Sequence, residues 1–340
     1  MERVEGSMKT VMVFGASGTL GTYLVDALAA AGYGVWAVGR RNIVPDYYSS
    51  RGIDCAEVDI CDPESFGALP EEGIDCVIQI AGAMPSRMPG YRPSLYLEVN
   101  TLGTLNVLEY CRHAGVERHF YMQSHSDVAG HWNTGELIPA NALRKPMLGG
   151  DHAIYIISKM AGGDLVEHYR IDHGLNAFVF RLPTIYCFRP IYEMYVAGEA
   201  RPLGYRYLIQ KAMAGDPIEI WGDPRRTKDI VYVKDYTQMM LRAVEAEAEG
   251  GIYNVASGVG TSLEDQVRGV IRVFCEPGQV SSISHRPDMP SQNSYLYDIS
   301  NARAELGYEP SYGYLDMLED MKLEMSGNRF DHLAGHSTDV

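Results

Sequence analysis

Residues 10–21 read TVMVFGASGTLG, and this stretch decides the fold. Its first part, Thr10–Phe14, is a short run of apolar and β-branched residues that predicts a buried strand. An amphipathic pattern over Thr19–Ala31 predicts a helix that ends at the Gly32 turn. The glycines between the two elements therefore lie on a strand-to-helix turn, at the carboxyl end of a strand.

Each glycine of this turn has its own physical reason. Gly15 permits the tight turn, Gly18 lets the backbone approach a pyrophosphate, and Gly21 lets the helix pack close to the sheet. Free N–H groups at the helix N-terminus face the anion. The turn therefore predicts a nicotinamide dinucleotide site, with a purely structural turn as the alternative. The residues expected to contact the cofactor here are Gly15, Ser17, Gly18, Thr19, Leu20 and Gly21.

The residues after the second predicted strand, Gly34–Val38, bear on the choice between NAD and NADP. Arg40 and Arg41 follow this strand, and the first acidic residue comes only at Asp46. A carboxylate would bind the adenosine ribose hydroxyls, whereas arginine suits a 2′-phosphate. The sequence thus predicts NAD(P) with a preference for NADP, and the alternative is a pair of solvated surface arginines.

Strands and long helices alternate through the first half of the chain. Further strands are expected at Asp75–Ile80, His119–Gln123, Ala177–Phe180 and Ile252–Val255, and further helices at Asn100–Ala114, Ile154–Tyr169, Asp235–Ala246 and Ser262–Phe274. Such alternation implies right-handed crossovers and a parallel sheet. We therefore expect an α/β fold with a Rossmann-type, doubly wound parallel sheet.

The amino-acid composition changes after Pro183, where Pro, Gly and Tyr become frequent. We expect residues 9–183 to form the dinucleotide-binding domain, joined by returning segments near 228–256. Residues 184–326 are expected to form mainly a smaller α/β, C-terminal substrate-binding unit. Residues 327–340 lack periodicity and are predicted to be frayed.

The amino-acid composition limits the kinds of molecule that the protein is expected to bind. The 340 residues carry 29 Lys and Arg against 44 Asp and Glu, a net charge of −15, and such a surface repels nucleic acid. No apolar run is long enough to span a membrane. The six cysteines form no CxxC pair, which predicts reduced thiols and a cytoplasmic protein. The histidines lack metal-ligand spacing, so no metal is predicted, and the expected ligand is a small molecule.

Tyr155 and Lys159 stand four residues apart and share one face of a predicted helix. A lysine beside a tyrosine stabilises the phenolate and lowers the phenol pKa, which suits proton transfer. The same ammonium can donate to ribose hydroxyls of the cofactor. The pair is therefore predicted to be catalytic, and a surface Tyr/Lys pair is the alternative.

These motifs together resemble the extended short-chain dehydrogenases/reductases, the branch that includes sugar-nucleotide epimerases and dehydratases. The glycine turn has the GxxGxxG form of that branch, and Tyr155 with Lys159 has its YxxxK form. Further landmarks match in order: Asp59-Ile60, Ala81-Gly82-Ala83, Asn100 to Thr104, Arg181 to Tyr186, and Lys228 to Asp235. The resemblance runs from about Lys9 to Met325. It implies cofactor contacts from Asp59, Ile60, Ala81, Gly82, Ala83, Asn100, Tyr155, Lys159, Pro183 and Thr184.

The segment after the strand at 119–123 departs from the family pattern. Counting back from Val128 puts His125 where the family has a catalytic Ser or Thr, although Ser124 or Ser126 could serve after a shift of register. An imidazole N–H could donate to the substrate oxygen in place of a hydroxyl. Asp127 stands where dehydratases of this branch have a carboxylate, so it is a candidate base for elimination.

The resemblance predicts an NAD(P)-dependent epimerase/dehydratase that acts on a nucleotide sugar through a transient keto intermediate. In the second unit, Arg226 and Lys228 are candidates for the substrate diphosphate, or else a solvated charge cluster. The alternatives are an NADPH-dependent ketone or aldehyde reductase and a non-catalytic dinucleotide-binding module. The helices expected at 100–114 and 154–169 could pair in a homodimer.

Overall fold

The structure is a computed structural model that describes residues 8–40, 43–150, 152–191 and 193–333. Its centre is a seven-stranded sheet in the order β14-β7-β5-β4-β1-β2-β3, in which every neighbouring pair is parallel. The strands are β1 (Thr10–Phe14), β2 (Gly34–Gly39), β3 (Asp54–Glu57), β4 (Cys76–Gln79), β5 (Arg118–Ser124), β7 (Asn176–Leu182) and β14 (Gly250–Asn254). The predicted α/β fold with a doubly wound parallel sheet is confirmed. The winding reverses between β1 and β4, which is where ligands bind in open parallel sheets.

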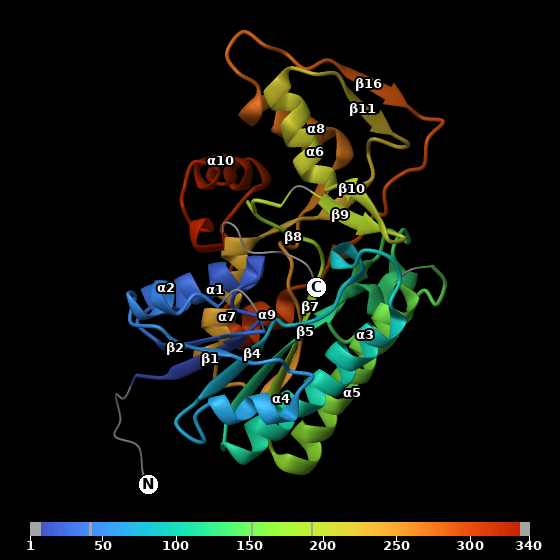
Figure 1. The fold of residues 1–340 in the computed structure, drawn as a ribbon. Coiled ribbons are helices and arrows are strands. Elements are labelled where there is room, and N and C mark those ends of the chain that lie inside the picture. Colours follow the sequence, from blue (N-terminus) through green and yellow to red (C-terminus); the bar gives the residue numbers. More distant parts are fainter. Residues whose placement is uncertain (1–7, 41–42, 151, 192, 334–340) are drawn as a thin grey trace.

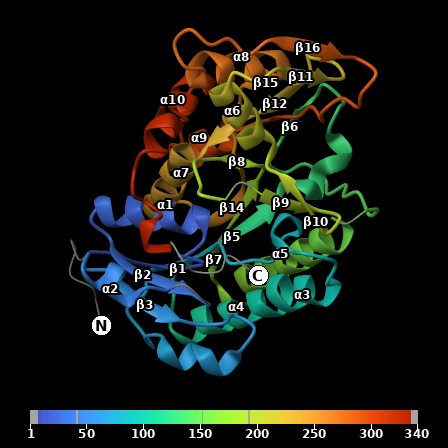
Figure 2. The ribbon, with the colours of Figure 1, turned by 45° about the horizontal axis from the view of Figure 1, so that its top comes forward.

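Helices cover both faces of this sheet (Figures 1 and 2). On one face lie α1 (Thr19–Ala30) and α7 (Val233–Glu245), with α2 (Pro45–Ser49) beside them, and on the other lie α3 (Pro93–Leu97), α4 (Gly103–His113) and α5 (Ala153–His173). A π-helical turn, Glu98–Leu102, joins α3 to α4, so the helix expected from Asn100 starts further upstream. The helix α5 ends where Gly174 adopts a left-handed φ of 68°, a common C-terminal stop.

A smaller α/β unit lies above the carboxyl ends of the strands (Figure 1). Its helices are α6 (Gly204–Ala214), α8 (Leu263–Phe274) and α10 (Tyr314–Glu324). Its strand pairs are β9 (Glu193–Val196) with β10 (Glu199–Pro202), β11 (Ile218–Trp221) with β16 (Ile283–Arg286), and β12 (Thr227–Asp229) with β15 (Gly260–Ser262). The helix α8 buries Val267, Val270 and Phe274 on one face, the spacing of an amphipathic helix.

Short elements connect this unit to the main sheet. The strand β8 (Ile185–Tyr186) pairs with β13 (Val231–Tyr232), and β6 (Leu137–Ile138) pairs with β17 (Leu296–Tyr297). The helix α9 (Ser300–Leu306) packs beside β14, where Asn301 donates a hydrogen bond of 2.8 Å to the Ile252 carbonyl. The chain therefore returns twice to the first unit, once through α7 and β14 and once through α9.

The last described residues differ from the frayed end that the sequence predicts. Arg329 forms ion pairs with Asp26 of α1 and with Glu324. The ring of Phe330 lies 5.7 Å from that of Tyr23, and His332 stacks on Tyr47 at 3.7 Å. Contacts with α1 and α2 therefore order this segment, which ends in a 3₁₀ turn at Asp331–Leu333. Residues 334–340 lie outside the described ranges.

The described part of the chain contains no helix long and apolar enough to cross a membrane. All six cysteines are free thiols.

Candidate active site

The glycine-rich turn between β1 and α1 leaves no room for larger residues. Gly15 has a φ of 92°, and a Cβ there would lie 2.7 Å from the backbone nitrogen of Ala81. A Cβ on Gly21 would collide with the carbonyl oxygen of Gly15. Gly15 and Ala16 donate backbone hydrogen bonds to the Val38 carbonyl, at 2.8 and 3.0 Å. This tight cradle at the N-terminus of α1 fits the diphosphate of a dinucleotide.

The residues expected near the adenosine lie at the ends of β2 and β3. Arg40 Nη1 is 3.9 Å from Asp59 Oδ2, and the same carboxylate accepts a hydrogen bond from the Cys61 backbone. Ile60 is buried beside them, and a Cβ on Gly103 of α4 would lie 2.8 Å from its side chain. Arg41 lies outside the described residues. A guanidinium and a carboxylate are thus both available to an adenosine ribose at this edge.

Tyr155 and Lys159 lie on α5, one turn apart, as expected. The Ser124 side chain at the end of β5 lies near the Tyr155 phenol and opposes the rise in its pKa. His125 points elsewhere, because its Nδ1 lies 2.9 Å from the Tyr297 hydroxyl. The structure therefore brings Ser124, and not His125, to the tyrosine. Ser124 stands one position before the residue reached by counting back from Val128, and residues 125–131 form an irregular 3₁₀ segment.

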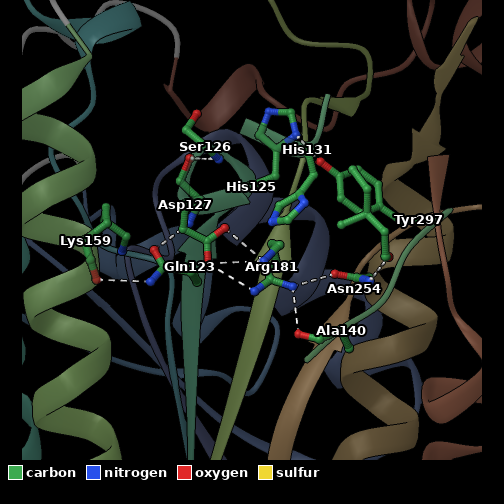
Figure 3. Close-up of polar contacts among 12 residues, drawn as sticks. Gln123, His125, Ser126, Asp127, His131, Ala140, Lys159, Arg181, Asn254 and Tyr297 are labelled. Carbon is green, nitrogen blue, oxygen red and sulfur yellow. Dashed lines mark hydrogen bonds and ion pairs between the residues drawn. The ribbon is translucent and has the colours of Figure 1, made fainter. Parts of the chain in front are cut away.

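Lys159 is buried, with 6% of its surface exposed, against aromatic and amide groups of β5. Its Nζ lies 4.1 Å from the centroid of the Tyr121 ring, a cation–π contact. The Tyr121 hydroxyl and the Gln123 amide both donate to the Lys159 carbonyl, at 2.9 and 3.3 Å, and Figure 3 shows the second of these bonds. Burial lowers the pKa of Lys159 to about 7, so a modest change in its surroundings alters its charge near neutral pH.

The structure does not lower the pKa of Tyr155 as the sequence predicts. Burial raises the pKa of this phenol, and the nearby Ser124 side chain only partly opposes that rise. The expectation assumed a charged ammonium beside the phenol, whereas the Lys159 ammonium lies over Tyr121 instead.

Asn100 connects the turn after β4 to α5. Its side chain accepts from the Ala83 backbone N–H at 2.8 Å and donates to the Ala83 carbonyl at 2.9 Å and to the Ser158 hydroxyl at 3.0 Å. Ser158 in turn donates to the Tyr155 carbonyl at 2.7 Å. Asn100 therefore ties the turn at residues 81–83 to α5, and its amide is occupied by protein groups where a cofactor contact was expected.

Asp127 lies in a buried ion pair (Figure 3). Its carboxylate accepts bonds from Arg181 at 2.9, 3.2 and 3.1 Å, and both side chains are almost fully buried, at 2% and 3% exposure. Arg181 also donates to the Ala140 carbonyl and to Asn254 Oδ1. Because both carboxylate oxygens of Asp127 accept hydrogen bonds from Arg181, the geometry does not support Asp127 as the base of an elimination.

His125 belongs to an aromatic cluster beneath the second unit. Its ring lies 4.7 Å from Trp132 and 5.2 Å from Tyr295. Burial and the positive charge of Lys228 lower its pKa to about 3, so the imidazole is neutral. Because the ring packs among aromatics, its role here is packing and a hydrogen bond to Tyr297.

The remaining predicted residues lie on separate elements of the chain. Pro183 is buried, whereas Thr184 is exposed at the end of β7. Lys228 on β12 is half-buried, and burial lowers its pKa. Arg226 bonds to Asn133 at 2.5 Å near the surface. Within the described residues, no three His, Cys, Asp or Glu side chains gather as a metal site would require.

Tyr121, Gln123 and the pairing of Arg181 with Asp127 were not predicted from the sequence. A signal was present in β5, where His119, Tyr121 and Gln123 alternate with apolar residues although all residues after the first of this strand are buried. Alternating polar residues on a buried strand need partners on one face, and here α5 and the π-helical turn supply them. The Arg181–Asp127 pair had no comparable local pattern.

Comparisons with known proteins show the family to which this chain belongs. The model of the NAD dependent epimerase/dehydratase family matches residues 11–256. A UDP-glucose 4-epimerase of Mycolicibacterium smegmatis is 27% identical, over 88% of this chain and 93% of that protein. A GDP-6-deoxy-D-mannose reductase of Pseudomonas aeruginosa is 28% identical, over 79% of this chain and 80% of that protein.

Solved structures show the same fold. A UDP-glucose 4-epimerase of Thermotoga maritima, solved with UDP-glucose, superposes with a TM-score of 0.74 at 20% identity, covering 94% of this chain and 100% of that one. A UDP-glucose 4-epimerase of Thermus thermophilus in complex with NAD gives a TM-score of 0.70 at 23% identity, covering 96% of this chain and 100% of that one. With the family model spanning most of its length, this chain belongs to the NAD-dependent epimerase/dehydratase family, enzymes of the extended short-chain dehydrogenase/reductase type.

Proposed function

We propose that this enzyme epimerises a nucleotide sugar through a transient keto intermediate, with NAD(P) as a recycled cofactor. The observation that carries the proposal is that Tyr155 and Lys159 share α5, with Ser124 near the phenol and a turn that fits a dinucleotide at the start of α1. A nicotinamide held at this turn would supply reversible hydride transfer with a sugar carbon.

The protein groups would manage the proton that accompanies this hydride. Tyr155, as phenolate, would take the proton from the sugar hydroxyl, and the C–O bond would become a carbonyl. Ser124 would donate a hydrogen bond to the same oxygen. Lys159 would supply the positive charge that a buried phenolate needs, because burial alone raises the phenol pKa.

We favour epimerisation over dehydration because elimination needs an additional base. Asp127 is the candidate from the sequence, and its bonds to Arg181 occupy both carboxylate oxygens. Re-reduction from the opposite face needs no further acid or base.

For the cofactor we propose that Arg40 contacts a 2′-phosphate and gives a preference for NADP. Arg40 is the guanidinium at the end of β2, and its contact with Asp59 is long, at 3.9 Å, which leaves donors for a phosphate. The Thermus thermophilus structure with NAD supports the dinucleotide class, not this preference.

For the substrate we propose the second unit as the binding partner, with Lys228 and Arg226 near the diphosphate. Lys228 forms a β-bridge with Tyr295, whose ring lies 5.2 Å from that of His125, the residue after Ser124. The Thermotoga maritima enzyme, solved with UDP-glucose, supports a nucleotide sugar as the ligand class.

We also propose a homodimer through the helices of one sheet face. Leu97 on α3, Leu102 in the π-helical turn and Ile157 on α5 are 44%, 56% and 38% exposed, although these helices pack together. Two copies of this face could bury these side chains in one bundle.

The test is turnover of a panel of UDP-, dTDP- and GDP-sugars, followed by NMR of the sugar while absorbance records reduced nicotinamide. We expect a new sugar epimer without net change of NAD(P)H. Tyr155→Phe should abolish this conversion and retain dinucleotide binding, whereas Tyr91→Phe, at an exposed tyrosine, should leave it unchanged. Net consumption of NADPH would support the reductase alternative, and an unchanged panel with cofactor bound would refute the proposal.

A further inference from the structure

Tyr121 is a polar aromatic residue at a fully buried position in the middle of β5. Its neighbours in the strand, Phe120 and Met122, are apolar, and a hydroxyl at this depth needs a hydrogen-bond partner. The partner comes from α5, because the Tyr121 hydroxyl donates to the Lys159 carbonyl at 2.9 Å. The phenol thus connects the sheet to the helix at the residue to which the proposed function gives a catalytic role.

The helix leaves room for this phenol at Gly162, in the next turn of α5. A Cβ at Gly162 would lie 2.5 Å from the Tyr121 hydroxyl, so a larger residue would displace the ring. Gln123, two residues further along β5 and on the same face, donates to the same Lys159 carbonyl at 3.3 Å (Figure 3). Two donors of the strand therefore hold one carbonyl of the helix, which fixes the Tyr121 ring beside Lys159.

The Lys159 ammonium lies over the face of the Tyr121 ring. Its Nζ is 4.1 Å from the ring centroid, well inside the range of about 6 Å for a cation–π contact. The ammonium also lies by the turn after β4, since a Cβ built on Gly82 would be 3.9 Å from Nζ. Among the described residues no carboxylate forms an ion pair with this ammonium, and burial lowers the Lys159 pKa. The ring face therefore takes the place of a counter-ion.

The other titratable groups that the structure describes near Lys159 supply no unpaired anion. Burial lowers the pKa of His119, on the same strand as the ring, to about 3, so the imidazole is neutral. Burial raises the pKa of the Tyr155 phenol on α5, so this group keeps its proton near neutral pH. Arg144 and Asp164 form their own ion pair, at 2.6 Å, near the surface. The aromatic ring is therefore the group whose removal should change the charge of Lys159 most directly.

We propose that Tyr121 is a positioning residue for Lys159: its ring face stabilises the buried ammonium beside the turn after β4, and its hydroxyl keeps the ring in place against α5. This inference deepens the proposed function, on which its consequence for turnover rests. Tyr121 acts through Lys159 and needs no contact with substrate or cofactor. A residue without a π face at this position would leave the ammonium in an apolar environment, where it gives up its proton more readily.

Three replacements of Tyr121 separate the ring from the hydroxyl. Tyr121→Phe keeps the ring face and removes the hydroxyl, whereas Tyr121→Leu removes both. Trifluorophenylalanine at the same position keeps the shape of the Phe ring but withdraws electron density from its face, so it weakens a cation–π contact without opening a cavity. The matched control is Tyr308→Leu, at another fully buried tyrosine whose hydroxyl donates to a backbone carbonyl, that of Ala256 at 2.9 Å.

The first measurement needs no substrate. In protein that carries isotope-labelled lysine, the pH titration of the Lys159 side-chain NMR signal gives the pKa of this group, and the signal is identified by its loss in Lys159→Met. We expect Tyr121→Leu and the trifluorinated ring to lower this pKa by about one unit from its value of about 7. Tyr121→Phe and Tyr308→Leu should leave it close to that of the wild type. Because the trifluorinated ring fills the same space, it carries the test if Tyr121→Leu does not fold.

The second measurement is the pH profile of kcat/KM with a sugar nucleotide that the enzyme converts. A lower Lys159 pKa means that the charged form is lost at a lower pH. Tyr121→Leu should therefore reduce kcat/KM by up to about tenfold above neutral pH and much less in mild acid, and Tyr121→Phe should restore the wild-type profile. A residue that merely supports the fold would lower kcat/KM by the same factor at every pH.

Two results would overturn the inference: an unchanged Lys159 pKa in the folded Tyr121→Leu or trifluorinated protein, or an equal shift in Tyr308→Leu. If the Lys159 pKa shifts as expected while the wild type converts no sugar nucleotide, the proposed function fails and the effect of Tyr121 on the ammonium stands.

Discussion

Replacing Asp127 by asparagine tests whether this carboxylate supports the scaffold or the chemistry. The change keeps the shape of the side chain and removes its charge, which leaves the Arg181 guanidinium buried without its anion. Arg181 makes three bonds to Asp127, at 2.9, 3.2 and 3.1 Å, and two more to Ala140 and Asn254. Breaking a buried pair by removing one partner costs about 3–5 kcal/mol. Because asparagine keeps one acceptor oxygen and the bonds to Ala140 and Asn254 remain, we expect about 3 kcal/mol.

A second variant separates the attraction between Asp127 and Arg181 from the cost of burying their charges. Burial raises the pKa of Asp127 although Arg181 opposes that rise, so desolvation outweighs the attraction within the pair. The double change Asp127→Leu with Arg181→Met should therefore destabilise the protein less than Asp127→Asn alone.

The assay is urea unfolding followed by circular dichroism, with turnover measured on the same samples at a temperature where each variant is folded. Asp223→Asn, which breaks an exposed ion pair with Arg225, is the control and should change the free energy of unfolding by less than about 1 kcal/mol. If Asp127→Asn left stability within about 0.5 kcal/mol of wild type and yet abolished turnover, the carboxylate would be a reacting group and the reasoning would fail.

Three other predictions concern the site and its supports. Burial lowers the pKa of Lys159 to about 7 from its ordinary 10.5, so between these two pH values the unfolded chain binds a proton that the folded chain does not. The free energy of unfolding should therefore rise with pH over this range. Lys159→Met should flatten this rise when urea midpoints are measured as a function of pH. Gly162→Ala should cost about 1–3 kcal/mol, since a Cβ would lie 2.5 Å from the Tyr121 hydroxyl, whereas Gly204→Ala has open space and should cost little by thermal unfolding. Arg40→Gln should weaken binding of NADPH more than that of NADH in fluorescence titrations, and equal losses would refute a 2′-phosphate contact.

The part of this protein that could be predicted from the sequence rests on short-range rules. The turn at residues 15–21 was predictable because each glycine meets a backbone requirement of its own neighbours. The strands and helices of the sheet were predictable because burial on one or both faces imposes a period on adjacent residues. Tyr155 and Lys159 share a face for the same reason, since α5 places residues four apart on one side.

Long-range packing determined which groups meet at the site. Asp127 and Arg181 are 54 residues apart in the sequence, and Arg329 and Asp26 are 303 residues apart. No local sequence pattern predicts either contact. Ser124, and not His125, lies near Tyr155 because of where β5 ends against α5. The His125 imidazole packs against Trp132 in an aromatic cluster instead. Periodicity reports which face of an element is buried, whereas the identity of its partner depends on how distant elements come together in the folded chain.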